Sequence, residues 1–279
     1  MITLANDRLA LTLEPGFGAR VTSLTDRTTG RQWLVPGDCE DRSVYLGAQA
    51  RGWDECFPTV GVCDHASWDG PMRDHGELWG RPWTVTHDAR ACTATYSDPR
   101  FAFVRSLELV GATVIANYHA TNLSPRSLPY LWSQHALLAT TPDDRIMLDG
   151  ITDMQADGQL LVWPHHPARD LSLVGAWYEG FALKLYGRAG NAACAEVAGP
   201  DGGIRFDWSG AGIPAFGLWL DYGGWPPGTP VHQIALEPTT APADDLAGAE
   251  AMGRARILAP GETHRWSVRI TLTTPSRPI

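Results

Sequence analysis

The chain has 279 residues, 12 tryptophans and a formal net charge of −9. A chain of this length can bury about three quarters of its unfolded surface, so it can be stable without disulfides, as one large β domain or as two smaller ones. The acidic balance offers no basic field to phosphates and therefore argues against nucleic acids and anionic membranes as partners.

The cysteines and the N-terminus bear on the compartment. The five cysteines are odd in number and scattered, and no two have the spacing of a zinc or redox motif. The first residues lack the apolar region of a signal peptide, and no apolar run approaches the roughly 20 residues that span a bilayer. We therefore expect reduced thiols in a cytoplasmic protein.

The first 81 residues predict a strand-rich start followed by a long loop. Leucines alternate with smaller or polar residues over 9–13, and a Pro-Gly turn separates this run from a second one over 20–24 and a third over 32–35. Residues 36–81 show no such periodicity and are rich in Gly, Asp and Trp. We expect this segment to be irregular and functional.

The rest of the chain predicts many short strands. The candidate strands lie at residues 83–86, 92–96, 101–110, 113–121, 128–139, 181–186, 203–208, 215–220, 231–236 and 266–272. Residues 242–252 are the one helical pattern, with acids in the first turn. No linker divides the chain. The pattern predicts an all-β fold, a sandwich or a barrel, in a single domain over residues 1–279.

Residues 74–83 gather the groups that a site for a polar, ring-shaped ligand requires. The stretch Asp-His-Gly-Glu-Leu-Trp-Gly-Arg-Pro-Trp places His75 between carboxylates and beside flat aromatic rings. Its glycines and proline predict a loop that leads into a strand. The alternative is a surface turn whose tryptophans pack on the body of the protein.

Two strand residues are candidates for acid–base chemistry. His135 shares a strand face with Ser133 and Leu137, so it is either a core histidine or a catalytic one. Glu237 ends an apolar strand just before a proline, where partial burial would raise its pKa and suit a base, or where it would only cap a turn. Lys184, the only lysine, lies in an alternating pattern, and we expect it to be solvated rather than to form a Schiff base.

Taken together, these motifs resemble the aldose 1-epimerase (galactose mutarotase) superfamily over most of the chain. The resemblance is carried by His75-Gly76, His135, the Leu-Glu-Pro at 236–238 and the segment from Leu258 to Trp266, which occur in the family's order. It implies a large antiparallel β-sandwich, a supersandwich, with a sugar site on one concave face. No cofactor and no metal are implied.

The resemblance also implies roles for individual residues. Glu237 matches the family's general base, His135 its general acid, and His75 a second histidine that binds the sugar. Arg51 lies where the family has an arginine, in a different local context. Tyr178, with Glu179 beside it, stands at the position of a substrate-binding aspartate, so hexose specificity is expected to differ.

From the residues alone, further contacts to the sugar are candidates. Trp53, Trp79 and Trp219 could stack on sugar faces, although most tryptophans in so rich a chain must be core. Asp54 and Glu55 could bind hydroxyls or pair with arginines.

The leading hypothesis is an epimerase that interconverts the α and β anomers of an aldose, as a monomer or homodimer. A close variant acts on a phosphorylated or sulfonated hexose held by arginines at 51, 73 and 81. The alternatives are a carbohydrate-binding protein without turnover, and a lyase or glycosidase. A glycosidase would need Glu179 or Glu55 near Glu237 as its second carboxylate.

Overall fold

The computed structural model describes residues 1–37, 45 and 50–274, and within them the protein is built almost entirely from antiparallel strands. Its regular helical pieces there are the α-helix α1 (Leu246–Ala251) and the short 3-10 helix η2 (Ala66–Trp68). The predicted all-β class and antiparallel sandwich are confirmed. No helix in the described part of the chain is long and apolar enough to cross a membrane.

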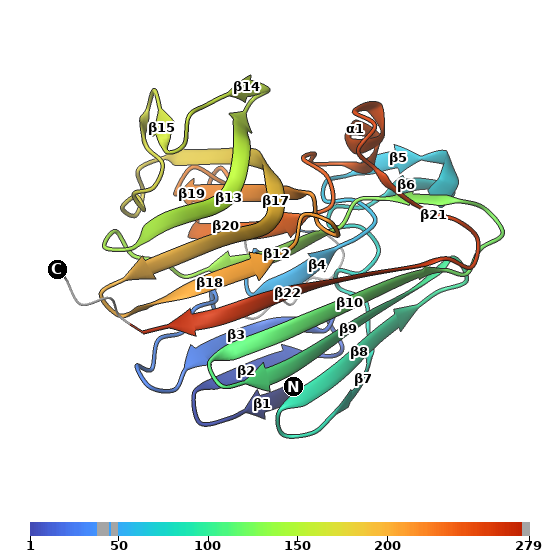
Figure 1. Cartoon of the computed structure of the whole chain (residues 1–279), viewed down its shortest axis with the longest axis horizontal. Helices are drawn as coiled ribbons and strands as arrows, with labels where there is room; N and C mark the ends of the chain where they lie inside the picture. The colour runs from blue at the N-terminus through green and yellow to red at the C-terminus, as the bar shows by residue number, and fades with distance from the viewer. Residues whose placement is uncertain (38–44, 46–49, 275–279) are drawn as a thin grey trace.

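One sheet of 16 strands dominates the molecule (Figure 1). Its main path runs in the order β1 (Ile2–Ala5), β2 (Leu9–Glu14), β3 (Arg20–Asp26), β4 (Trp53–Cys56), β12 (Ser133–Leu138), β20 (His232–Thr239), β19 (Ala215–Tyr222), β17 (Phe181–Gly199), β18 (Gly202–Trp208), β22 (Thr263–Thr273), β10 (Thr113–Asn122), β9 (Phe101–Val110), β8 (Ala91–Ser97) and β7 (Thr84–His87).

The remaining strands extend or flank this sheet. On its margin, β13 (Arg145–Ala156) pairs with β17 and with β14 (Gln159–Leu160). The two-stranded sheets are β11 (Leu128–Tyr130) with β21 (Arg256–Leu258), β15 (His165–His166) with β16 (Arg169–Asp170), and β5 (Cys63–His65) with β6 (Gly70–Met72). Figure 1 shows β5 and β6 beside α1.

The large sheet folds back on itself, which brings strands from distant parts of the path into contact. Glu55 on β4 binds Arg105 on β9, with 3.1 Å between Oε1 and Nη1, and accepts a hydrogen bond from Tyr118 on β10. Trp132 donates to the other carboxylate oxygen at 2.9 Å. Alternating buried and open positions along β9 and β22 fit strands with one face in the core. The two layers therefore enclose an aromatic core.

Three predicted boundaries need correction. The segment 36–81 is not irregular throughout, because β4, β5, η2 and β6 lie within it and β4 is an inner strand of the sheet; residues 38–44 and 46–49 of that segment lie outside the described part. All four residues of β4 are buried, so the strand faces protein on both sides and shows no alternation in sequence.

The other misplaced boundaries are smaller. The helix expected over 242–252 covers only 246–251, because the Asp245 side chain accepts from the Gly248 amide at 2.7 Å and caps it there. The strand expected over 32–35 is reduced to isolated bridges at Gln32 and Leu34.

Candidate functional site

The site is built on a row of residues that crosses five neighbouring strands on one face of the sheet. Asp54 on β4 is paired with His135 on β12. Between β12 and β20, Ser133 is paired with Thr239 and Leu137 with Ala235. This register places Glu237 opposite His135. Directly paired residues of antiparallel strands share a face.

The row continues from Glu237 to Gly217 on β19 and then to Tyr186 on β17. Because Gly217 has no side chain, the middle of the row is open. A Cβ atom there would lie 3.2 Å from Glu237 Oε2 and 3.3 Å from Lys184 Nζ, closer than ordinary van der Waals contact. The glycine thus provides the space in which Glu237 and Lys184 meet.

Lys184 reaches across this space to Glu237 and is not the solvated residue that the sequence predicts. Its Nζ lies 2.5 Å from Glu237 Oε1, and the two side chains are 20% and 1% exposed. Ser133 donates to the second oxygen, Oε2, at 3.2 Å. The carboxylate is therefore buried with a cation on one oxygen and a neutral donor on the other.

His135 approaches the same carboxylate oxygen from the other side. Its Nε2 is 3.9 Å from Glu237 Oε1, beyond hydrogen-bond length. Burial lowers the pKa of His135 well below its ordinary value, and His75, Lys184 and Arg20 lower it further. The imidazole is therefore neutral at neutral pH.

His75 lies against His135 at the mouth of the row. The two ring centroids are 4.8 Å apart, and the other neighbour of His75 is the Tyr45 ring, stacked at 3.5 Å. Asp74 is 2.8 Å from His75 Nδ1 and orients the ring. His75 has a φ of +62°, a backbone conformation that the tight turn before Gly76 imposes.

A cavity of about 320 Å³ opens over these residues. This is within the range of small-molecule sites, about 300–1,000 Å³. The described residues that line it are Tyr45, Ala50, Asp74, His75, His135, Lys184, Trp219, Trp225, Gln233 and Asp244. Glu237 is fully buried and lies next to Lys184 and His135.

The lining carries polar atoms without partners. His75 Nε2, His135 Nδ1, Tyr45 Oη and Gln233 Oε1 are buried and have no hydrogen-bond partner among the described residues. A buried polar atom without a partner is costly, so hydrogen bonds from a ligand rich in hydroxyl groups would offset that cost at each of these atoms that the ligand reaches. Trp219 and Trp225, nearly perpendicular at 6.2 Å, add flat apolar surface to the same cavity.

Trp53 and Glu55 do not line this cavity. Both side chains are 1% exposed or less, and Trp53 donates its indole N–H to Glu55 inside the core. Burial raises the pKa of Glu55 to about 7, against the opposing effect of Arg105 and its hydrogen-bond donors. The structure therefore gives these two predicted sugar-binding residues a place in the core.

Arg51, Tyr178 and Glu179 are also outside the lining. Arg51 donates to the carbonyl of Pro36 at 2.6 Å. Tyr178 is 69% exposed, and Glu179 forms an ion pair with Arg169 and accepts from the Ala176 amide. Of the predicted residues, the structure brings Glu237, His135, His75 and Trp219 together at the cavity. It places five others elsewhere, namely Arg51, Trp53, Glu55, Tyr178 and Glu179.

Sequence reasoning missed several residues of the cavity. Gln233 was detectable, because it stands four positions before Glu237 on a strand and hence on the same face. Asp74 lies inside the predicted stretch 74–83, where the sequence indicates it only as a carboxylate next to His75. For Lys184 the sequence shows only that it is the sole lysine. Its contact with Glu237 depends on the pairing of three strands, β17, β19 and β20.

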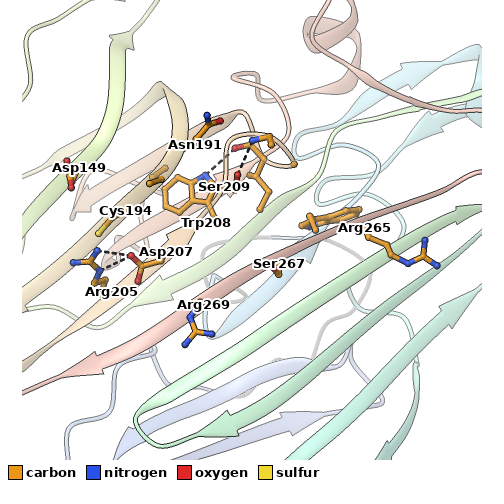
Figure 2. Close-up of a pocket in the computed structure, with 16 residues that line it drawn as sticks. Asp149, Asn191, Cys194, Arg205, Asp207, Trp208, Ser209, Arg265, Ser267 and Arg269 are labelled. Carbon is orange, nitrogen blue, oxygen red and sulfur yellow. Dashed lines mark hydrogen bonds and ion pairs between the residues drawn. The ribbon is translucent and has the colours of Figure 1, made fainter.

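A larger cavity, of about 580 Å³, lies over β13, β17, β18 and β22 (Figure 2). Figure 2 shows Arg205 and Asp207 paired with each other there, and the two nitrogen–oxygen distances are 2.8 and 2.9 Å. Arg269 and Arg265 come from β22. No histidine or glutamate lines this cavity among the described residues, so it offers no acid–base pair like that at Glu237.

Solved structures of similar fold were found, whereas no family model and no curated protein sequence matches the chain. A galactose mutarotase related enzyme from Lactobacillus acidophilus superposes with a TM-score of 0.71 at 16% identity, over 100% of this chain and 99% of the other. A galactose mutarotase-like protein from Lactobacillus casei superposes with a TM-score of 0.70 at 18% identity, over 98% of this chain and 99% of the other.

A galactose mutarotase-like protein from Clostridium acetobutylicum gives a similar result. Its TM-score is 0.70 at 14% identity, over 98% of this chain and 94% of the other. Identities this low establish the architecture and leave the activity to the site itself. The protein therefore has the galactose mutarotase-like fold.

Proposed function

We propose that the protein is an epimerase that interconverts the α and β anomers of a free, uncharged aldose. The observation that carries this proposal is the buried carboxylate of Glu237, placed between Lys184 and His135 below a cavity with four unpartnered polar atoms. The mutarotase-like fold supports the same reaction class.

The reaction requires one base and one acid at neighbouring atoms. The base removes the proton from the anomeric hydroxyl, the bond between C1 and the ring oxygen breaks, and the acid protonates that ring oxygen. After rotation about the C1–C2 bond, the ring closes on the other face of C1 with the two roles reversed. Since both oxygens are bonded to the same carbon, the base and the acid must lie close together, as Glu237 and its neighbours do.

The other residues of the cavity suit substrate binding. His75 Nε2 and the side chain of Gln233 are available to sugar hydroxyls, and Asp74 orients His75. Trp219 and Trp225 can pack on the apolar faces of a pyranose ring. No step in this scheme requires a metal or a cofactor.

The charges of the lining favour a neutral sugar over a phosphorylated or sulfonated one. Lys184 is the one cationic Lys or Arg side chain among the described residues of the cavity, and Glu237 already binds it. Of the arginines considered for an anion clamp, Arg73 donates to the carbonyls of Gly76 and Trp79, and Arg81 pairs with Glu77.

The test is the rate of anomer exchange, measured by NMR with wild type and Glu237→Gln on neutral, phosphorylated and sulfonated aldoses. We expect acceleration with a neutral aldose and a loss of about 10²–10⁴-fold in the variant, because glutamine cannot accept the proton. Circular dichroism serves as the folding control.

Two results would contradict the proposal. Unchanged exchange in folded Glu237→Gln would remove Glu237 as the base. Binding of aldoses by wild type without any acceleration would instead favour the carbohydrate-binding protein, which needs no acid–base pair. For the glycosidase alternative, neither of the two expected second carboxylates, Glu55 and Glu179, lines the cavity.

A further inference from the structure

The proton donor to the ring oxygen can be identified more closely, and the argument rests on the epimerase proposal. Lys184 and His135 both line the cavity and both lie next to Glu237 Oε1. Only one of them is in hydrogen-bond contact with that oxygen. The distance is 2.5 Å for Lys184 Nζ and 3.9 Å for His135 Nε2.

The charge states of the two candidates differ. His135 is buried next to His75, Lys184 and Arg20, and these surroundings lower its pKa and keep it neutral. A neutral imidazole can donate a hydrogen bond, but it transfers a proton only by becoming an anion. An ammonium group, in contrast, can release a proton and become a neutral amine.

Lys184 contacts a buried carboxylate at the site. Its Nζ binds the carboxylate of Glu237 on β20, and the ring of Tyr186 on its own strand lies 5.3 Å away. The imidazole of His135 on β12 lies 3.9 Å from the same carboxylate oxygen. Asp244, which accepts from Tyr186 Oη at 2.6 Å, and Asp74 line the same cavity. Two further carboxylates therefore line the cavity that Lys184 lines.

We propose that Lys184, rather than His135, protonates the ring oxygen, so that the Glu237–Lys184 ion pair is the acid–base couple of the reaction. His135 is then a neutral group that binds the substrate. The lysine would be a catalytic residue, and Gly217 would be the position that lets it reach the carboxylate.

The proton balance of this step closes without another reactant. Glu237 Oε1 takes the proton from the anomeric hydroxyl, and the electrons of that O–H bond form the carbonyl. The bond between C1 and the ring oxygen breaks, its electron pair stays on the ring oxygen, and that oxygen takes a proton from Lys184 Nζ. Ring closure on the other face returns a proton to the amine and takes one from the carboxyl group, which restores the ion pair.

The test compares three substitutions at position 184 by NMR anomer exchange. Lys184→Met removes both charge and proton, and Lys184→Arg keeps a charge that is not released below about pH 12. We expect both to lower kcat by about 10²–10⁴-fold. In Lys184→Ala, added methylamine or ethylamine should restore exchange in proportion to amine concentration.

The division of the effect between KM and kcat gives a second readout. His135→Gln, which keeps a hydrogen-bonding group, should raise KM more than it lowers kcat. Aldose binding, followed by the change in total tryptophan fluorescence, shows whether each variant retains the cavity that Trp219 and Trp225 line.

The outcomes separate this inference from the proposed function. If Glu237→Gln abolishes exchange while Lys184→Met or Lys184→Arg keeps kcat within about threefold, the epimerase stands and Lys184 is not the acid. A failure of amines to restore Lys184→Ala, together with binding as tight as that of wild type, would also overturn the assignment. If wild type does not accelerate exchange at all, the epimerase proposal itself fails.

Discussion

Protonation of His135 is expected to affect the stability of the protein. Burial, His75, Lys184 and Arg20 hold the pKa of its imidazole well below the ordinary value. The unfolded chain, in contrast, binds a proton near pH 6.5. As pH falls below that value the unfolded state takes up a proton that the native state does not, so the free energy of unfolding decreases towards lower pH.

This reasoning predicts a difference between wild type and His135→Gln. Between pH 8 and pH 5, the free energy of unfolding of wild type should fall by up to about 1.4 kcal/mol per pH unit from this group, and the variant should lack that part of the slope. Guanidinium unfolding at several pH values measures both. Parallel pH dependences in the two proteins would show that His135 is protonated equally in the folded and unfolded states.

At the scale of the strand, the critical position is one that carries no side chain. Gly217 stands between Glu237 and Tyr186 in the row and adjoins both members of the Lys184–Glu237 pair. A larger residue would separate the pair while suiting a strand, because β-branched residues are favoured there.

We therefore predict that Gly217→Val lowers the rate of anomer exchange by about 10²-fold, the scale of a misplacement of about 1 Å. Gly217→Ala should have a smaller effect. Chemical denaturation tests whether stability changes in parallel. An active Gly217→Val protein would mean that the contact of Lys184 with Glu237 is not required for turnover.

The same strands show what sequence can and cannot predict about the site. Glu237, His135 and His75 each stand in a local motif, and alternation along the chain is enough to assign them to strands or loops. Lys184 meets Glu237 only through the pairing of β17 with β19 and of β19 with β20. A one-residue shift in either register would turn the lysine to the other face, and single-sequence periodicity does not determine register.

The burial of Glu55 shows a second limit. Glu55 lies on β4, whose residues are buried on both faces of the strand. Apolar and polar residues therefore do not alternate along β4, and the sequence does not indicate a strand there. A carboxylate there is expected on the surface or at a site, and only the fold reveals that Arg105, Tyr118, Trp53 and Trp132 surround it.

For the whole molecule, Glu55 and Arg105 are a charged contact between strands far apart in the sheet order. Both side chains are fully buried. Removing one partner leaves the other charge without compensation inside the core, at a cost of about 3–5 kcal/mol.

We predict that Arg105→Met destabilises the protein by about that amount, and that Glu55→Gln combined with Arg105→Met recovers part of it, because no buried charge remains. The free energies of unfolding of wild type, Glu55→Gln, Arg105→Met and the double variant, measured with denaturant, form a double-mutant cycle. A double variant as unstable as the sum of the single variants would indicate that the two residues act independently.

The row of residues across five strands also has a consequence for how the protein folds. Its members come from strands at 53–56, 133–138, 181–199, 215–222 and 232–239, so distant parts of the chain must pair before the row exists. Closing such long loops costs chain entropy, and topologies dominated by non-local pairing fold slowly. A nascent chain or a misfolded intermediate would contain the same amino acids without the ion pair or the cavity. Under the proposed function, turnover of sugar begins only when the last of these strands has paired, so the appearance of activity would measure the completion of folding.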